Sequence, residues 1–567
     1  MKPWIVSLVF LVCAAAQSVA VAPPQPAEET VKPEDRCTVE GTVVNLKTGE
    51  PLKKAQVKLA RVGSQSDSAS LSATTDAAGH FALAEVNPGK YTLGARRNGF
   101  ADSQYGSRGE GSPGTQLTLL KGQKLKGIVF RMTPQGVVTG RVLDEDGEPV
   151  ARAQVAFLRP MFVNGHKMLM PTFNSMAQTD DRGEYRAFGL APGKYYVYAD
   201  FDALGRGGQE AGQRDASRQG YAPTLYPNAT NVSQASLVEV AAGAEVSGID
   251  FQLAPVRTYR IAGKMSGLAE GAGSMIMVMS RDSGILPWNS LKRASPDHKG
   301  NFVVHGLVPG SYTVNAQSFS SGSETQMAEA IVNVTDSDVD GVVLDLGAAH
   351  EITGAIKAEA GADLKKKGLT VSLNGEARMF GIGMSGGQVQ EDGTFKIRLQ
   401  SPDRYRVNIY PMPEGAYVKS IRFGETEYPT GMIDMSKGVT GGELAIVIAG
   451  NGAQIDGNVR DQKDQPATSA SVVLIPEQRD NHMMYEMANT DQNGHFTIKG
   501  VTPGKYKAFA FDRVEYGQYE DPDFLKQFEE KGEAVEVSAG DKTSKDLKLI
   551  VTDEDLPPEP PAPQPGS

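Results

Sequence analysis

The sequence predicts an all-β protein built from five tandem Greek-key β-sandwich domains of about 90–120 residues each. One turn-and-strand pattern recurs five times, which indicates a repeat architecture. Glycine is abundant, with 63 of 567 residues, and the hydrophobic share of 40% is too high for a disordered chain. Helical periodicity is nearly absent, apart from a short segment at 523–528. The glycine surplus therefore belongs to recurring turns between short strands.

The repeated pattern is a β-hairpin followed by a second strand. It contains Asp-x-x-Gly-x-Phe/Tyr, then an apolar strand and Pro-Gly-x-Tyr. Aspartate accepts hydrogen bonds from its own turn and glycine tolerates positive φ, so together they make a tight turn. Ten residues separate the turn glycine from the residue after proline in every copy: Gly79 and Gly89, Gly183 and Gly193, Gly300 and Gly310, Gly393 and Asp403, and Gly494 and Gly504.

Three further markers accompany the hairpin. The tyrosine after each Pro-Gly turn opens the next strand, and we expect its ring in the core and its hydroxyl on a nearby backbone group. Most copies close with a short strand that begins with glycine, as at 127–130, 248–251 and 341–344. Each hairpin is preceded by a strand with a central glycine: Gly41, Gly140, Gly263, Gly354 and Gly457.

Unit boundaries are predicted just before each glycine-centred strand. Almost no linker separates neighbouring units, so we expect them to form a semi-rigid rod. A linker at 23–36 and a Pro-rich tail at 553–567 are predicted to be disordered. The five sandwiches are unit 1 (37–133), unit 2 (134–255), unit 3 (256–348), unit 4 (349–451) and unit 5 (452–552).

Residues 1–22 are typical of a secretory signal peptide. An apolar run from Ile5 to Ala16 leads into small residues, which predicts cleavage near Ala20 or Ala22. This run is too short to span a membrane, and no later run approaches the roughly 20 apolar residues that a spanning helix needs. The mature chain is therefore expected to be soluble, without a transmembrane segment, and secreted, periplasmic or on the cell surface.

Charge and cysteine content exclude two further classes. The formal net charge of −11 argues against a nucleic-acid partner, which needs a concentrated basic face. After cleavage Cys37 is the one remaining cysteine, so an internal disulfide is excluded. Burial of Cys37 is favoured, and a disulfide between two chains stays the alternative.

A search for chemistry predicts no catalytic residue, no metal site and no cofactor. The seven histidines are scattered through the units, and neither His-Glu-x-x-His, Gly-x-Ser-x-Gly nor a P-loop occurs. The segment 336–341 superficially matches a calcium loop, but Gly347 stands where a bidentate glutamate is needed, so a solvated turn is favoured. Distant carboxylate pairs keep a secreted hydrolase open as a third hypothesis.

Aromatic clustering is the compositional anomaly. Residues 185–226 hold eight aromatic residues, well above the 7% of the whole chain. Alternation places Tyr195 and one of Tyr196 or Tyr198 on opposite faces of a strand, so about half of these rings belong to a core. A mainly structural role is favoured, while stacking on sugar rings is the functional hypothesis. The candidate binding residues are Tyr198, Tyr221, Tyr226, Trp288, Tyr516 and Tyr519.

The glycine-centred strand, the Asp-x-x-Gly-x-Phe turn and the Pro-Gly-x-Tyr turn together resemble the carboxypeptidase regulatory-like domain. The resemblance implies an immunoglobulin- or prealbumin-like sandwich, and it covers about residues 37–550. Related sandwiches stand beside enzymes without doing chemistry, bind carbohydrate or build surface stalks. We therefore expect an exported, non-enzymatic protein that binds a polysaccharide or another cell-envelope surface ligand. A structural or protein-interaction module with an envelope protein as partner is the alternative.

Overall fold

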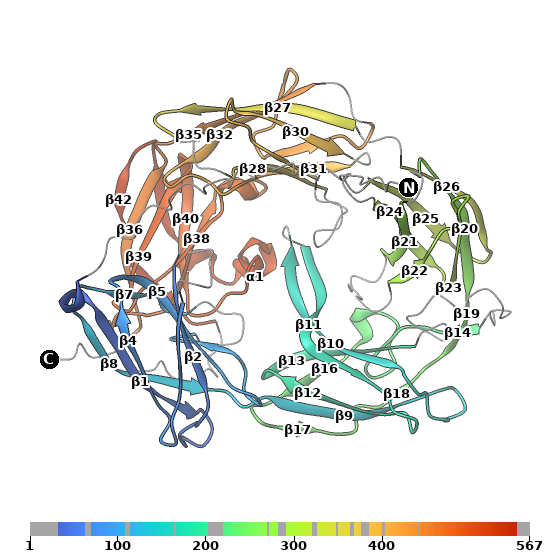
Figure 1. Ribbon diagram of the computed structural model, residues 1–567, viewed down its shortest axis with the longest axis horizontal. Coiled ribbons are helices and arrows are strands. Elements are labelled where there is room, and N and C mark those ends of the chain that lie inside the picture. Colours follow the sequence, from blue (N-terminus) through green and yellow to red (C-terminus); the bar gives the residue numbers. More distant parts are fainter. Residues whose placement is uncertain are drawn as a thin grey trace, which may run out of the picture.

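A computed structural model confirms the all-β class. It shows β-sandwiches arranged in a closed ring (Figure 1). The predicted signal peptide and the Pro-rich tail lie outside the described residues. The structure describes residues 32–62, 70–107, 114–163, 166–201, 219–268, 272–281, 291–319, 326–346, 350–362, 368–375, 385–399, 403–438 and 442–552.

Units 1 and 2 each pair a glycine-centred sheet with a second sheet. The linker prediction at 23–36 is wrong for residues 32–36, because η1 (Pro33–Asp35) forms there and the Asp35 carbonyl accepts the N–H of Gly122 at 2.9 Å. The elements of unit 1 are β1 (Cys37–Asn45), β2 (Gln56–Arg61), β3 (Ser70–Thr74), β4 (His80–Val86), β5 (Gly89–Arg96), β6 (Ser103–Gln104), β7 (Leu117–Leu119) and β8 (Lys124–Met132). Those of unit 2 are β9 (Gly136–Leu143), β10 (Gln154–Val163), β11 (His166–Gln178), β12 (Glu184–Leu190), β13 (Gly193–Asp200), β14 (Gln219–Tyr221), β15 (Thr224–Leu225), η3 (Val232–Gln234), β16 (Leu237–Val240), β17 (Glu245–Val246) and β18 (Phe251–Gln252). In unit 1 the strand orders are β4-β1-β8 in one sheet and β3-β2-β5-β6, with β7 also paired to β5, in the other. In unit 2 they are β12-β9-β17, with β18 also paired to β9, and β11-β10-β13-β15, with β16 also paired to β13.

Units 3 and 4 repeat this arrangement with different edges. Unit 3 contains β19 (Pro255–Arg257) at its junction with unit 2, then β20 (Tyr259–Ser266), β21 (Gly273–Ser280), β22 (Lys292–Ala294), β23 (Asn301–Leu307), β24 (Gly310–Phe319), β25 (Gln326–Val334) and β26 (Val339–Asp345). Unit 4 contains β27 (His350–Glu359), β28 (Thr370–Gly375), β29 (Ser385–Gln388), β30 (Thr394–Leu399), β31 (Arg404–Tyr410), β32 (Tyr417–Phe423), β33 (Thr426–Glu427), β34 (Met432–Asp434) and β35 (Glu443–Ala449). In unit 3 the strand orders of the two sheets are β23-β20-β26 and β22-β21-β24-β25. In unit 4 they are β30-β27-β35-β32-β33 and β29-β28-β31-β34.

Unit 5 joins its two layers through one shared strand. Its elements are β36 (Ala453–Arg460), β37 (Ser471–Pro476), η4 (His482–Met484), β38 (Glu486–Asn489), β39 (His495–Val501), β40 (Gly504–Phe511), η5 (Gln518–Glu520), α1 (Pro522–Lys526), η6 (Glu529–Lys531), β41 (Glu533–Val537), β42 (Lys542–Ser544) and β43 (Leu547–Ile550). The order is β38-β37-β40-β43-β36-β39, with β41 on β40 and β42 on β36. The short helix α1 lies on the segment where the sequence predicted one.

Each of the five glycine-centred strands allows a close approach that a side chain would block. A methyl group on Gly41 would overlap the carbonyl oxygen of Ile128 on the parallel strand β8 and lie 2.8 Å from Cε1 of Phe81. The same two neighbours recur in every unit, because the hairpin aromatic ring always covers the glycine. The corresponding covering rings are Tyr185 over Gly140, Phe302 over Gly263, Phe395 over Gly354 and Phe496 over Gly457.

The two turn motifs form as predicted. In the hairpin turn of unit 1 the Asp76 carboxylate accepts the backbone N–H groups of Ala78 and His80, both at 2.9 Å. The tyrosine after the Pro-Gly turn lies in the core and donates its hydroxyl to the carbonyl oxygen four residues earlier, as Tyr91 does to Asn87 at 2.8 Å. Tyr195, Tyr312 and Tyr506 make the same bond in units 2, 3 and 5.

All five sandwiches have the same orientation in the ring. The glycine-centred strands β1, β9, β20, β27 and β36 lie on the outer side, whereas the sheets that contain β5, β13, β24, β31 and β40 face the interior (Figure 1). Each predicted unit has its own main hydrophobic cluster, lying within 37–132, 138–253, 261–346, 352–448 and 453–549.

The expectation of a rod is wrong, because unit 5 returns to contact unit 1. The hydroxyls of Thr115 and Ser469 hydrogen-bond to each other across the contact. The side chain of Gln492 bonds Thr118, and Gln116 forms a parallel β-bridge with Asp491. We call these six residues the latch. Its contacts join segments more than 350 residues apart in the chain and close the ring.

We expect Gly41→Ala to destabilise unit 1 by roughly 1–3 kcal/mol, because the added methyl group must displace β8 or the Phe81 ring. Hydrogen-exchange mass spectrometry of β1 and β8 peptides measures this loss in one unit of the full chain. Gly94→Ala in β5 is the matched control, since a methyl group there lies at an ordinary 3.6 Å from the nearest atom. Equal exchange in both variants would contradict the proposed role of Gly41.

Candidate functional site

Unit 5 carries an insertion, residues 513–532, on its ring-facing side. It contains η5, α1 and η6, and α1 lies toward the ring interior (Figure 1). The strand β40 explains its position, because Ala508 and Ala510 face the sandwich core while Phe509 and Phe511 face the insertion. The second cluster formed there contains Val473, Ile475, Phe509, Phe511, Val514, Tyr519, Leu525 and Ile550.

A row of rings runs from the surface of the insertion into unit 5. Tyr516 contacts Tyr519 edge to face, with centroids 6.2 Å apart. Tyr519 stacks on Tyr485 at 6.3 Å, and Tyr485 stacks on His482 at 5.9 Å. The row ends where Nδ1 of His482 lies 2.7 Å from Oε2 of Glu520. Tyr516 is 76% exposed and Tyr519 only 5%, so Tyr516 offers the free ring face of this row.

The insertion also contacts unit 2. Beyond Leu158, strands β10 and β11 pair with each other and extend past β13 as a two-stranded arm, residues 159–163 and 166–170. A methyl group on Gly517 would lie 2.6 Å from the carbonyl oxygen of Phe162 in this arm, so the two backbones touch. Gly517 has φ of 79°, a conformation that favours glycine. Tyr516 therefore lies beside a contact between two units.

The structure places Tyr198 in the interior of unit 2. Its ring is 5% exposed and packs with Leu158 and Leu225 in a second cluster on the inner sheet. Tyr196 packs against the same cluster, so both tyrosines lie on the face opposite Tyr195. Tyr198 and Tyr519 have no free ring face for a ligand in this conformation.

Tyr221 and Tyr226 pack against the main cluster of unit 2 but are only partly buried. Tyr221 contacts Phe201 at 6.0 Å and Tyr226 contacts Phe251 at 6.1 Å, both edge to face. Burial, followed by the negative charge of Glu145, raises the pKa of the Tyr221 hydroxyl. Trp288 lies outside the described residues. The predicted binding residues that the structure describes are therefore not gathered into one site.

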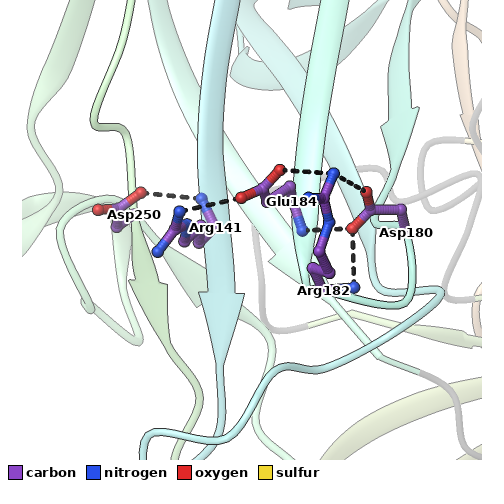
Figure 2. A network of polar contacts seen from close by, with 5 residues as sticks. All are labelled: Arg141, Asp180, Arg182, Glu184 and Asp250. Carbon is purple, nitrogen blue, oxygen red and sulfur yellow. Dashed lines mark hydrogen bonds and ion pairs between the residues drawn. The ribbon is translucent and has the colours of Figure 1, made fainter.

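The outer sheet of unit 2 carries a charged network (Figure 2). Asp250 accepts the backbone N–H of Arg141 at 2.8 Å, and the Arg141 guanidinium donates to Glu184 at 2.9 Å. Arg182 lies 3.4 Å from Glu184 and 3.7 Å from Asp180. Backbone N–H donors, that of Glu184 first, lower the pKa of Asp180. All these side chains are solvated, so the network orders a surface turn and offers no enclosed site.

A shallow groove of about 510 Å³ lies on unit 1 between strands β1, β3, β4 and β8. Glu40 and Lys126 face each other across it at 3.8 Å, and His80 lines it. The Asp76 carboxylate at its rim already serves the hairpin turn. The groove therefore offers few free polar groups to a ligand.

The segment that resembles a calcium loop is paired with a cation. Asp338 accepts the backbone N–H of Arg260 at 3.2 Å, and Asp340 lies 3.3 Å from the guanidinium of the same arginine. In the part of the chain that the structure describes, no group of three or more His, Cys, Asp or Glu side chains could hold a metal ion. Cys37 is fully buried and donates its thiol to the carbonyl of Leu120 at 2.9 Å, as the favoured prediction had it.

These features define a protein of tandem β-sandwiches with elaborated loops, and comparison with known families makes the class specific. Residues 38–133 and 137–254 match the family model of the carboxypeptidase regulatory-like domain. Units 1 and 2 thus match that domain as two tandem copies, which confirms the resemblance for these two of the five units. No curated protein matches the chain. Across the described residues, no helix is long and apolar enough to cross a membrane.

Several solved structures of bacterial pilins are similar to parts of the chain. The minor pilin GBS52 of Streptococcus agalactiae is 14% identical, with 38% of this chain and 96% of that chain covered and a TM-score of 0.21. A streptococcal ancillary pilin is 11% identical, with 55% and 98% covered and a TM-score of 0.18. BcpA, the major pilin subunit of Bacillus cereus, is 10% identical, with 55% and 100% covered and a TM-score of 0.14. TM-scores of this size support no inference about function or assembly.

Sequence reasoning missed one partly buried carboxyl group in unit 5, that of Glu486. Glu486 on β38 pairs with Leu474 on β37, whose side chain faces the sandwich core. At the corresponding position of unit 1, Leu71 pairs with Leu59. Burial raises the pKa of Glu486 to about 7. Strand alternation could have identified Glu486, because residues 486 and 488 of β38 lie on the same face and Ala488 packs against the core.

Glu486 is expected to make unit 5 less stable as the pH rises. Its folded pKa of about 7 exceeds its ordinary value of 4.5, so its contribution is intact below pH 4.5 and is lost as the pH rises through about 7. The loss should reach roughly 2–3 kcal/mol above pH 7. Glu486→Gln should remove this pH dependence and stabilise unit 5 at pH 8.

Pulse proteolysis in urea at pH 5 and pH 8 compares the two proteins, with cleavage sites assigned to unit 5 by mass spectrometry. Glu443→Gln on the surface of unit 4 is the control, because Glu443 is exposed. A variant Glu486→Gln that keeps the wild-type pH dependence would show that another group is responsible.

Proposed function

We propose that the protein is an exported, non-enzymatic scaffold that binds a polymeric surface ligand, a polysaccharide, through the insertion of unit 5. The observation that carries this proposal is Tyr516, whose ring is 76% exposed and supported edge-on by the buried Tyr519. An exposed ring fixed by a second ring can stack on the apolar face of a sugar with little loss of side-chain entropy.

The surroundings of Tyr516 suit a long ligand better than a small one. The insertion lies on the ring-facing side of unit 5 and touches the arm of unit 2, where the side chain of Met161 is 37% exposed. A ligand that meets Tyr516 therefore meets surfaces of two units, and an extended polymer can contact both. The carboxypeptidase regulatory-like domains of units 1 and 2 favour a non-catalytic role for the frame.

A protein partner is the second candidate. Phe188 on β12 and Val343 on β26 are 67% and 68% exposed, and both strands belong to outer sheets. Exposed apolar side chains on a sheet face suit contact with another protein. Crosslinking of the chain to an envelope protein would favour this role over polysaccharide binding.

We expect Tyr516→Ala to reduce retention on insoluble polysaccharides by roughly three- to tenfold, the loss of one stacking contact of about 0.5–1.5 kcal/mol. Cosedimentation of the full chain with a panel of insoluble polysaccharides measures the retention. Tyr410→Ala is the matched control, because Tyr410 is 69% exposed on unit 4 and lies outside the insertion. Retention that is absent in the wild type, or equal in all three proteins, would rule out this binding site.

A further inference from the structure

The latch covers an edge of unit 1 that a strand could occupy. Strand β7 pairs with β5 on one side. On its other side the N–H of Thr118 donates to Oε1 of Gln492 at 3.1 Å, and the carbonyl of Thr118 accepts from Nε2 of the same residue at 3.4 Å. Gln116 adds a parallel bridge to Asp491. Unit 5 thus satisfies backbone groups that an uncovered sheet edge would present to another chain.

Opening the ring separates unit 5 from unit 1 and also separates Gly517 from Phe162 in the arm of unit 2, and it exposes the polar groups that the latch buries. Thr115 is 1% exposed and Ser469 is 4% exposed, and their hydroxyls hydrogen-bond to each other. Water can replace these partners, so the net stabilisation from hydrogen bonds of this kind is modest. A contact made of polar groups is therefore able to open and close again.

Unit 5 keeps its fold when the latch opens because it has a hydrophobic core of its own, and bonds to unit 4 keep it in place at one end of the ring. Nζ of Lys499 lies 2.8 Å from Oε1 of Glu414, and Nδ2 of Asn481 donates to the carbonyl of Pro429 at 3.1 Å. The latch surface of unit 5 therefore stays folded at one end of the chain, and that of unit 1 stays at the other end.

The two latch surfaces are different from each other and complementary. Within one chain the intervening units raise their effective concentration, but the contacts themselves are the same for two chains. A contact between different surfaces joins copies head to tail. We propose that the latch is an exchangeable interface, in which unit 5 of one chain docks on the β7 edge of unit 1 in a second copy of this chain.

Two cysteine variants of the full chain test the exchange. Thr115→Cys and Ser469→Cys place thiols where the two hydroxyls touch, which suits a disulfide. The double variant oxidised at low concentration should form the bond within one chain. A concentrated mixture of the two single variants should form disulfide-linked dimers that contain one chain of each kind. Cys37 stays in place because it is fully buried.

Each single variant alone is the control, since it lacks the complementary cysteine. Dimers that form no faster in the mixture than in either single variant would overturn the proposal, even if the double variant closes normally. Failure of the double variant to close would overturn the latch itself. Sedimentation velocity adds a second measurement: the wild type should associate as concentration rises, and the oxidised double variant should lose this dependence while its reduced form regains it.

Discussion

Each sandwich depends on the close approach of a glycine backbone to the parallel strand beside it, under the face of an aromatic ring. At Gly41 the carbonyl oxygen of Ile128 and the ring of Phe81 occupy the space of a side chain. The ring comes from the hairpin strand, so one contact fixes three strands of the outer sheet in register. The Asp76 turn then sets the start of that hairpin strand. The three sequence markers of the repeat are thus parts of one packing requirement.

This requirement explains why architecture could be predicted from the sequence and the arrangement of the units could not. Glycine, aspartate and aromatic residues recur at fixed spacing because every unit needs them. Ring closure depends instead on single polar side chains such as Gln492 and Ser469, which follow no period. Short junctions predict that neighbouring units are held at a fixed angle, but they do not predict whether successive angles produce a rod or a ring. Turns in one direction at successive junctions bring the first and last units together, as the ring shows (Figure 1).

The candidate site was predictable only in part, for reasons that lie in strand alternation. Tyr198 and Tyr519 belong to aromatic-rich segments, and for this reason the sequence predicted both as binding residues. Each ring is buried because a neighbouring segment covers it, which the sequence does not show. Exposure of Tyr516 depends on the path of the insertion backbone at Gly517. The spacing of residues in the sequence therefore predicts neither the burial of Tyr198 and Tyr519 nor the exposure of Tyr516. The partly buried Glu486 interrupts the apolar pattern of a core-facing position, and the sequence alone could have shown this.

The insertion of unit 5 and the aromatic rings within it have one cause. In unit 1, β5 places Lys90, Thr92 and Arg96 on its ring-facing side, so this face is compatible with solvent. In unit 5, β40 places Phe509 and Phe511 there, and a strand that is apolar on both faces must be covered on both. The segment that covers it needs apolar residues of its own, which brings further aromatic rings to the sequence. Most of those rings must face inward to cover the strand. Tyr516 faces outward instead, so packing does not explain its exposure.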